Sequence, residues 1–504
     1  MLAKTLSGTV LGINGQIIEV EVDLSNGLPS FDLVGLADTA VKESKERVRA
    51  AIKNTGYEFP IQRIIVNLAP ADLKKEGGSF DLPIALGILS AQGLLFAPKL
   101  AAGMILGELA LDGSIRPIRG ALPMVIAAQK EGLDFVILPL SNYAETRVVK
   151  GIKIIPVDHL RAAVDFLVTG SLPLVTPTPP VQETGVYDHD YLDVKGQETA
   201  KRALEIAAAG GHNLLMVGPP GSGKTMLARR LPSILPDLSW EEAVELTKIY
   251  SIAGLLTPGM SLVSKRPFRS PHHTISKAGM IGGGKYPRPG EVTLAHHGVL
   301  FLDELPEFPK DVLEALRQPL EDRAVTVTRS MLSLTYPAGF MLLCSMNPCP
   351  CGYLHDARQP CSCTPRQIQR YRSRLSGPFL DRIDFLIEVQ RLSEEEMLGV
   401  KAGESSRTIR ERVIKARKVQ ADRFQGMPIH ANAQMGEGEL KLFCELSGES
   451  RRLLVAAIRS YNISARGYSR LLKVARTIAD LRGEEKINAA SLAEAIQYKG
   501  LEGI

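Results

Sequence analysis

A glycine-rich loop constrains the fold of this chain more than any other stretch. The run Gly218-Pro-Pro-Gly-Ser-Gly-Lys224-Thr225 follows the apolar residues 213–217 and precedes a helix predicted to begin at Lys224. Glycines let backbone N–H groups curl around phosphate oxygens, and a helix N-terminus turns its positive dipole end toward the same anion. The pattern therefore predicts a phosphate-binding loop rather than an ordinary glycine-rich turn. The residues expected to contact ATP are Gly218, Pro219, Pro220, Gly221, Ser222, Gly223, Lys224 and Thr225, with Thr225 also a ligand of Mg²⁺.

The pattern of apolar residues divides the 504-residue chain into several parts. Residues 1–170 alternate strand-like and helical runs and predict an α+β domain, and the proline-rich residues 171–186 predict an extended linker. Residues 187–392 alternate helices and strands around the phosphate loop, which predicts a parallel α/β nucleotide-binding domain. Residues 393–504 carry apolar positions at helical spacing and predict a helical domain.

The net charge and the hydropathy pattern limit how this chain can interact with nucleic acids and membranes. The net charge is only +5, so affinity for nucleic acid must come from local patches rather than from the whole chain. No apolar run approaches the roughly 18 residues of a membrane span, and the N-terminus lacks an apolar signal core. We therefore expect a cytoplasmic protein that makes no contact with membranes.

Two further apolar runs end in polar residues that suit phosphate chemistry. Asp303 and Glu304 follow residues 298–302, and Asn347 follows residues 340–346. Asp303 would hold the water shell of Mg²⁺, Glu304 would act as general base, and Asn347 would orient water or sense the γ-phosphate. An N-cap would explain an isolated Asp-Glu pair, and a turn would explain Asn347, but their occurrence after the phosphate loop favours catalysis.

Four of the six cysteines form a cluster with the spacing C-x-C, nine residues, C-x-C. Four thiolates in a loop rich in proline and glycine can close tetrahedrally around Zn²⁺, although cysteines can also act as small hydrophobic residues. The predicted zinc ligands are Cys349, Cys351, Cys361 and Cys363. Residues 366–374 then carry four arginines around Tyr371, which suits DNA phosphates and a stacked base, or a basic face between subunits.

Two pairs of adjacent histidines, His272-His273 and His296-His297, also invite a metal hypothesis. Neighbouring residues on a strand point to opposite faces, so shared coordination by such a pair is awkward. We expect these histidines to have structural or nucleotide-proximal roles.

The combination of these motifs resembles the AAA+ ATPases, in the branch of magnesium chelatase motor subunits and replicative MCM helicases. The resemblance rests on the phosphate loop, Asp303-Glu304, Asn347, residues 379–384 and residues 464–467. It implies that Arg382 is a finger inserted into the ATP site of a neighbouring subunit and that Arg466 contacts the γ-phosphate from the lid. Arg470 is the rival of Arg466, and surface ion pairs are the alternative role for both Arg382 and Arg466. A finger supplied by a neighbour implies a closed ring, by resemblance a homo-hexamer.

The N-terminal segments 75–81 and 106–120 resemble the Lon protease domain. In that family a serine at the position of Ser79 is the nucleophile, and a lysine serves as its base. The corresponding position here is Leu122, so Ser79 lacks the group that would activate it. We expect a Lon-protease-like (ribosomal S5 domain 2-like) α+β fold without proteolysis, ahead of an AAA+ P-loop parallel α/β domain with a helical lid.

Over nearly its whole length the chain resembles the bacterial ComM/YifB family of magnesium-chelatase-like proteins. The resemblance implies an ATP-driven DNA motor, a hexameric helicase that promotes branch migration in recombination and natural transformation. Three alternatives stay open. They are a chelatase-type motor for metal insertion, a Lon-like serine protease, and a DNA scaffold that uses ATP only for assembly. The first would need integrin-like and porphyrin-binding partner subunits, and this chain contains neither such domain.

Overall fold

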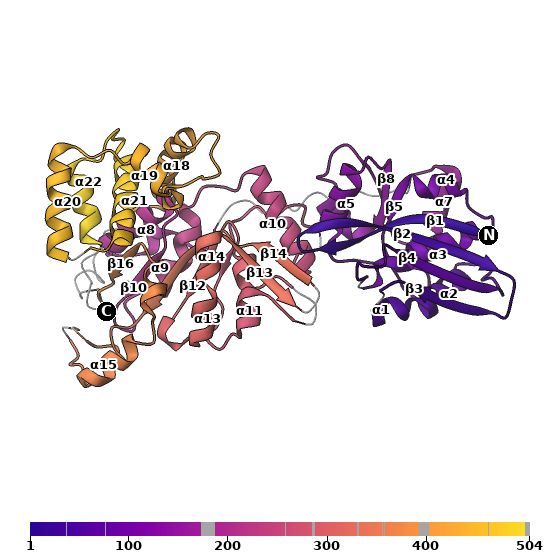
Figure 1. Cartoon of the computed structure of the whole chain (residues 1–504), viewed down its shortest axis with the longest axis horizontal. Helices are drawn as coiled ribbons and strands as arrows, with labels where there is room; N and C mark the ends of the chain where they lie inside the picture. The colour runs from indigo at the N-terminus through magenta and orange to yellow at the C-terminus, as the bar shows by residue number, and fades with distance from the viewer. Residues whose placement is uncertain are drawn as a thin grey trace. The chain divides into compact units, whose positions relative to one another are not determined.

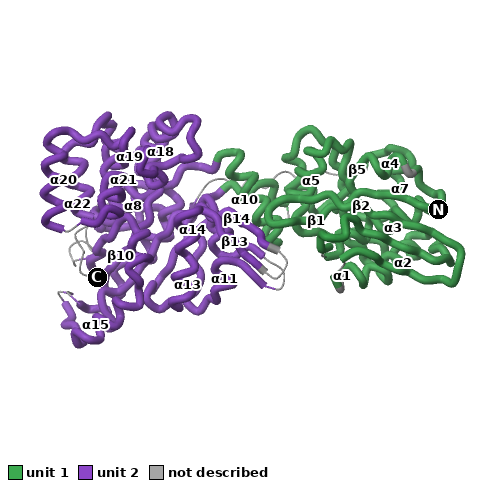
Figure 2. The backbone as a smooth tube through the Cα atoms, in the orientation of Figure 1, with its two compact units in different colours: residues 1–184, 239–264 green, residues 185–238, 265–504 purple. Residues whose placement is uncertain are grey.

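The chain folds into two compact units, which are coloured separately in Figure 2. Unit 1 comprises residues 1–184 and 239–264, and unit 2 comprises residues 185–238 and 265–504. The computed structural model describes residues 1–36, 38–75, 77–172, 187–257, 259–284, 288–329, 332–354, 356, 358–392, 403–461 and 463–498. The predicted linker at 171–186 therefore lies almost wholly outside the described residues.

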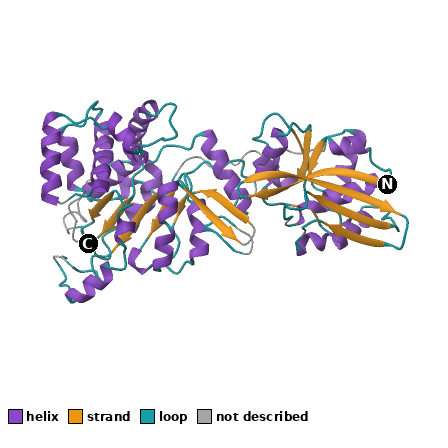
Figure 3. Ribbon diagram, viewed as in Figure 1, coloured by secondary structure: helices purple, strands orange, loops and turns teal. Residues whose placement is uncertain are grey.

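Unit 1 is built on a twisted mixed sheet (Figure 3). Its strands run in the order β3-β4-β2-β1-β5-β8-β9, with β1–β2 and β2–β4 antiparallel and the other pairs parallel. Buried and exposed side chains alternate along the strands, and every second residue of β4 is buried on the face that packs on the helices. The strands are β1 (Leu2–Leu11), β2 (Asn14–Ser25), β3 (Ser30–Val34), β4 (Arg63–Ala69), β5 (Gly103–Ile105), β8 (Phe135–Pro139) and β9 (Lys153–Val157), beside a separate hairpin of β6 (Glu108–Leu109) and β7 (Ile115–Arg116).

The helices of unit 1 cover this sheet, and the hydrophobic core lies between the helices and the strands. Every residue of α3 is buried, and α3 packs on β1 and β2. The helices are α1 (Thr39–Lys42), α2 (Ser44–Asn54), α3 (Asp81–Ala91), α4 (Ala97–Ala101), α5 (Ala121–Lys130), α6 (Tyr143–Thr146), α7 (Leu160–Thr169) and α10 (Trp240–Ala253). Helix α10 belongs here because it packs on α5, and the backbone N–H of Gly120 donates to the Ser251 carbonyl at 3.1 Å. This differs from the sequence analysis, which assigned residues 239–264 to the nucleotide-binding domain.

The core of unit 2 is a parallel sheet in the order β11-β12-β15-β10-β16. Its strands are β10 (Leu214–Val217), β11 (Phe268–Arg269), β12 (Val299–Leu302), β15 (Met341–Met346) and β16 (Phe385–Glu388). All residues of β10, β12 and β15 are buried, as expected for strands covered on both faces. Because the strands are parallel, their carboxyl ends share one edge, where ligands of such sheets bind.

Helices flank this sheet, and a second group forms the lid (Figure 1). The first group is α8 (Glu198–Gly210), α9 (Lys224–Arg230), α11 (Lys277–Ile281), α12 (Glu291–Leu294), α13 (Lys310–Ala315), α14 (Arg317–Asp322), α15 (Pro365–Arg372) and α16 (Gly377–Leu380), and β13 (Ala324–Arg329) pairs with β14 (Leu332–Pro337) as a hairpin. The lid is α18 (Ser406–Arg423), α19 (Glu437–Phe443), α20 (Gly448–Tyr461), α21 (Ala465–Arg482) and α22 (Ala489–Gln497). None of the helices in the described ranges has the length and apolar character needed to cross a membrane.

Candidate ATP site and thiol cluster

The phosphate loop connects β10 to α9 at the carboxyl edge of the sheet. Gly223 has a φ of 92°, a conformation that glycine adopts without strain. A Cβ on Gly218 would lie 2.1 Å from the Val389 carbonyl oxygen, so only glycine fits where the loop passes β16. The sequence therefore folds this loop tightly enough to present its backbone N–H groups to an anion.

Lys224 lies folded over the loop. Its Nζ donates to the carbonyl oxygens of Gly218 at 2.7 Å and Pro219 at 3.0 Å, and to Oδ1 of Asn347 at 3.3 Å. Burial lowers the pKa of Lys224 to about 8, although the nearby Asp303 and Glu304 favour its charged form. The structure thus brings the predicted lysine and the predicted sensor into direct contact.

The carboxylate of Asp303 connects three parts of the site. Its Oδ2 accepts a hydrogen bond from Thr225 Oγ1 at 2.7 Å, and its Oδ1 accepts one from the Ser345 hydroxyl on β15. Carboxylate and hydroxyl oxygens are the donors that Mg²⁺ prefers, so Thr225 and Asp303 suit that ion. Sequence reasoning missed Ser345, because a serine within an otherwise apolar strand carries no chemical signature of its own.

Glu304 projects from the end of β12 and has a histidine as neighbour. Its backbone is left-handed, with a φ of 52°, and its carboxylate is 60% exposed. The Nδ1 atom of His273 lies 3.7 Å from Glu304 Oε2. His272 and His273 do not lie on a strand, and their ring centroids are 4.1 Å apart, so the argument from opposite strand faces does not apply to them. His273 is therefore the histidine that lies beside the carboxylate of Glu304.

The predicted arginines lie near the amino-terminal ends of the sheet strands, whereas the phosphate loop lies at their carboxyl-terminal ends. Arg382 precedes β16, is 9% exposed, and pairs with Glu321 while donating to the Pro378 carbonyl. Arg466 is 65% exposed and lies 3.8 Å from Asp381. In this chain both arginines thus make the ion pairs that were the alternative to their catalytic roles.

Arg470 fixes the lid to the same end of the sheet, where the strands begin. Its Nη1 donates to the Ile383 carbonyl at 2.6 Å, and its Nη2 contacts Asp381 Oδ1 at 3.1 Å. The backbone N–H groups of residues 384 and 385 bond to the Asn213 carbonyl, just before β10 begins. From there β10 runs about 13 Å to the phosphate loop. Arg466, predicted to contact the γ-phosphate from the lid, instead lies beside Asp381, at the end of the strands away from the loop of its own chain.

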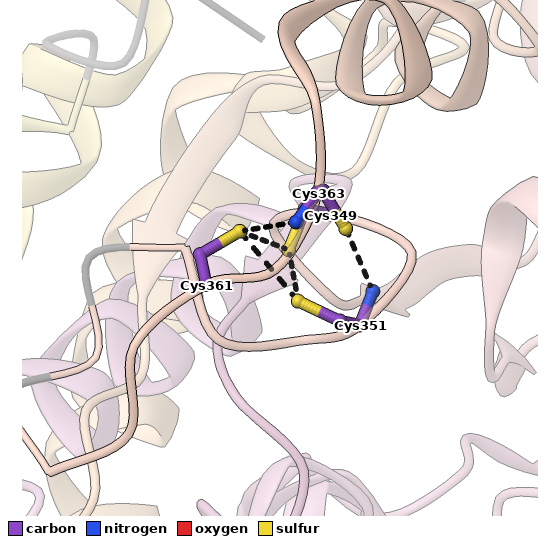
Figure 4. Close-up of side chains that lie close together, drawn as sticks. All are labelled: Cys349, Cys351, Cys361 and Cys363. Atoms are coloured by element: carbon purple, nitrogen blue, oxygen red, sulfur yellow. Dashed lines mark hydrogen bonds between the residues drawn. The ribbon is translucent and has the colours of Figure 1, made fainter.

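The four clustered cysteines converge in one loop (Figure 4). The Sγ atoms of Cys349, Cys351 and Cys361 are separated by 3.3, 3.6 and 3.7 Å, and all four thiols lie within 4.8 Å of one another. A tetrahedral zinc site with Zn–S bonds of about 2.3 Å has sulfur atoms about 3.8 Å apart. Backbone N–H groups also point at sulfur, from Cys351 to Cys363 at 3.3 Å and from Cys363 to Cys361 at 3.4 Å. This donor set fits Zn²⁺.

The arginine-rich segment after the thiol loop forms helix α15. A capping box fixes its start, in which Thr364 Oγ1 accepts from the Gln367 N–H at 3.3 Å. Arg366 and Arg370, one turn apart, are exposed. Tyr371, by contrast, is buried, and its phenol lies near the backbone of Asn347. Tyr371 is therefore unsuited to stack on a base, as the sequence pattern suggested, because burial against Asn347 occupies it.

Ser79 marks the Lon-like position of unit 1. Ser79 lies in a short 3₁₀ turn (Gly78–Phe80), half-exposed, and Leu122 is fully buried in α5. Lys75 is buried, and its ammonium donates to the Pro70 carbonyl. The lysine closest in sequence to Ser79 is thus committed to a structural hydrogen bond.

Comparison with known proteins explains this combination of parts. A family model described as magnesium chelatase, subunit ChlI, matches residues 190–397, and related models match residues 20–142 and 403–499. YifB of Escherichia coli strain K12 is 46% identical over 98% of this chain and 96% of its own length. The chain belongs to the magnesium-chelatase-like AAA+ family that includes YifB and ComM. The competence protein ComM of Haemophilus influenzae is 43% identical over 99% of this chain and 98% of its own length.

The family match accounts for both units. A Lon protease of Trichlorobacter lovleyi is 26% identical over 29% of this chain and 19% of its own length, which fits the Lon-like α+β fold of unit 1. The sequence-based fold class is thereby confirmed, with an AAA+ P-loop domain and helical lid in unit 2. Membership of an AAA+ ATPase family also implies ATP as nucleotide and Mg²⁺ as its metal.

Proposed function

We propose that this chain is an ATP-hydrolysing ring motor that acts on DNA, a branch-migration helicase for recombination and natural transformation. The observation that carries the ATPase half is the contact of Lys224, Thr225, Asp303 and Asn347 around one loop end. The DNA half is supported by the 43% identity to a competence protein and by the exposed arginines of α15.

The residues of the site divide the work of phosphoryl transfer. Lys224 binds the β- and γ-phosphates in place of the loop carbonyls it now contacts, and Asn347 orients the attacking water. Glu304 accepts the proton of that water once His273 releases its carboxylate. Thr225 and Asp303 would hold Mg²⁺, which would neutralise charge on the phosphate oxygens.

The position of the arginines supports a shared active site. Arg382 and Arg466 lie at the edge opposite their own phosphate loop, so neither reaches the nucleotide of its own chain. In a ring, the same edge of each protomer faces the next protomer, and both side chains then serve a neighbour's ATP. For Arg382 this requires exchange of its ion pair with Glu321 for the phosphate. We propose a homo-hexamer on the family resemblance.

The thiol loop and α15 supply the proposed DNA contact. Zinc held by Cys349, Cys351, Cys361 and Cys363 stabilises a loop that has little other secondary structure. Helix α15 follows that loop, and its guanidinium groups at Arg366 and Arg370 are spaced to contact the backbone of single-stranded or branched DNA. A metal-insertion motor of the chelatase type is the second candidate, favoured by the match to subunit ChlI alone.

Unwinding of a synthetic four-way junction tests the proposal. We expect the purified protein to separate the junction with ATP but not with a non-hydrolysable analogue, and DNA to stimulate ATP turnover. The variant Glu304→Gln should still bind nucleotide but hydrolyse it at least roughly a hundredfold more slowly, because it lacks the general base. ATP turnover that is indifferent to DNA, or an intact junction, would refute the DNA motor.

A further inference from the structure

The thiol loop packs directly on the phosphate loop. Gly352 has a φ of 87°, and a Cβ there would lie 2.6 Å from Cδ of Pro220 and 3.8 Å from Cγ of Asn347. The backbone between the first and second cysteine pairs therefore rests on the nucleotide site without an intervening side chain. Cys349 itself lies two residues after Asn347 and is fully buried.

Arg391 joins the two loops from the side of β16. Its Nε and Nη2 atoms donate to the Pro220 carbonyl at 3.3 and 3.1 Å. The same guanidinium lies 3.5 Å from the Asp356 carboxylate and 5.4 Å from the ring centroid of Tyr353, both in the thiol loop. One rigid planar group therefore contacts the phosphate loop at Pro220 and the thiol loop at Tyr353 and Asp356.

A third connection reaches the sensor. The phenol of buried Tyr371, in the helix that follows the last cysteine, lies near the backbone of Asn347. The thiol loop therefore lies between Asn347 and Tyr371, two residues that are close in space. Asn347 in turn accepts a hydrogen bond from Lys224.

We propose that the zinc-thiolate loop is a clasp on the ATP site, in which Arg391 is the positioning residue, so that metal occupancy at the four cysteines sets nucleotide affinity. The proposal rests on the zinc and ATP sites proposed above but not on DNA. Loss of the metal releases Gly352 from Pro220, removes the support of Arg391, and frees Asn347.

Equilibrium binding of a fluorescent ADP analogue to the full chain, with zinc measured by mass spectrometry, tests the clasp. Arg391→Met should keep one zinc per chain yet bind the analogue roughly ten- to a hundredfold more weakly, as expected for loss of charge-assisted hydrogen bonds. Arg391→Lys should recover part of that loss, because an ammonium can still donate to Pro220. Cys361→Ser should lose both the zinc and the affinity.

Cys444→Ala is the matched control, since Cys444 is buried in the lid and lies outside the thiol cluster. It should keep zinc and nucleotide affinity unchanged. Thermal unfolding followed by circular dichroism identifies any variant that fails to fold, and Arg391→Met, a half-exposed change, then carries the test. The clasp is refuted by a chain that contains no zinc, by zinc-free protein with unchanged affinity, or by an Arg391→Met variant that binds like wild type. None of these readouts involves DNA or hydrolysis, so they separate this proposal from the motor function.

Discussion

Lys224 shows how burial prepares a residue for an anion. The surrounding loop lowers its pKa to about 8, so the free protein holds a partly neutral amine at slightly alkaline pH. Phosphate oxygens favour the ammonium and raise that pKa again, so nucleotide binding should take up a proton between about pH 8 and 10. Affinity is then highest below pH 8 and falls as pH rises through the pKa of the free site.

Calorimetry in buffers of different ionisation enthalpy measures this proton uptake directly. At pH 8.5 we expect a fraction of a proton to be taken up per nucleotide, and about none at pH 6.5. Lys224→Arg, whose side chain stays charged at both values, is the control and should show no difference. Equal uptake at both pH values in the wild type would contradict the lowered pKa.

Two arginines one turn apart on α21 have different environments and should respond differently to truncation. Arg466→Ala should change the free energy of unfolding by less than about 0.5 kcal/mol, because its contact with Asp381 is long and exposed. Arg470→Ala should cost about 1–3 kcal/mol, because it removes hydrogen bonds to Ile383 and Asp381. Urea unfolding of both variants measures the contrast. Because Arg466 is proposed to serve a neighbouring ATP site, Arg466→Ala should lower ATP turnover even though it leaves stability nearly unchanged. Equal destabilisation by both variants would contradict the different environments of the two arginines.

At the scale of elements, the lid is held together by a buried polar network on α21. The carboxylate of Asp480 accepts from Arg423 at 2.8 Å, Arg476 at 3.0 Å and Asn432 at 2.7 Å. Asp480→Asn would leave two buried guanidinium groups without their counter-charge and should destabilise the lid by about 3–5 kcal/mol. Thermal unfolding tests this, with the exposed change Asp422→Asn as control. A loss below about 1 kcal/mol would show that the network does little for the fold.

Most strands and helices could be predicted from the sequence, because apolar periodicity and motif spacing are local. The run 340–346, for example, became β15 at Met341–Met346, and the helical spacing predicted over residues 393–504 became helices such as α21. The partner of α10 could not be predicted, since its capping box at Ser239 defines a helix start but not the core it packs on. The end of the sheet on which the lid docks could not be predicted either, because it depends on the pairing of Arg470 with Asp381, 89 residues apart in sequence.

The site likewise combines contacts that could be predicted from the sequence with contacts that could not. The contact between Lys224 and Asn347 followed from parallel strand ends, which place such residues at one edge. The roles of Ser345 and His273 needed the fold, because a serine within a strand and a histidine in a turn carry no chemical signature of their own. The packing of Gly352 on Pro220 was unpredictable for the same reason.

For the whole molecule, we propose that each ATP site is completed by Arg382 of a neighbouring protomer. A Lys224→Ala protomer has a defective loop but an intact finger, and an Arg382→Ala protomer has the reverse. Random mixing in a ring leaves about a quarter of the interfaces with both parts intact.

ATP turnover of the two variants, alone and mixed, tests this claim most directly. Each variant alone should hydrolyse ATP at least roughly a hundredfold more slowly than wild type, because each lacks a group that binds or stabilises the transferred phosphoryl. The equimolar mixture should recover up to about a quarter of wild-type turnover. A mixture no more active than the sum of its parts would contradict a site shared between protomers.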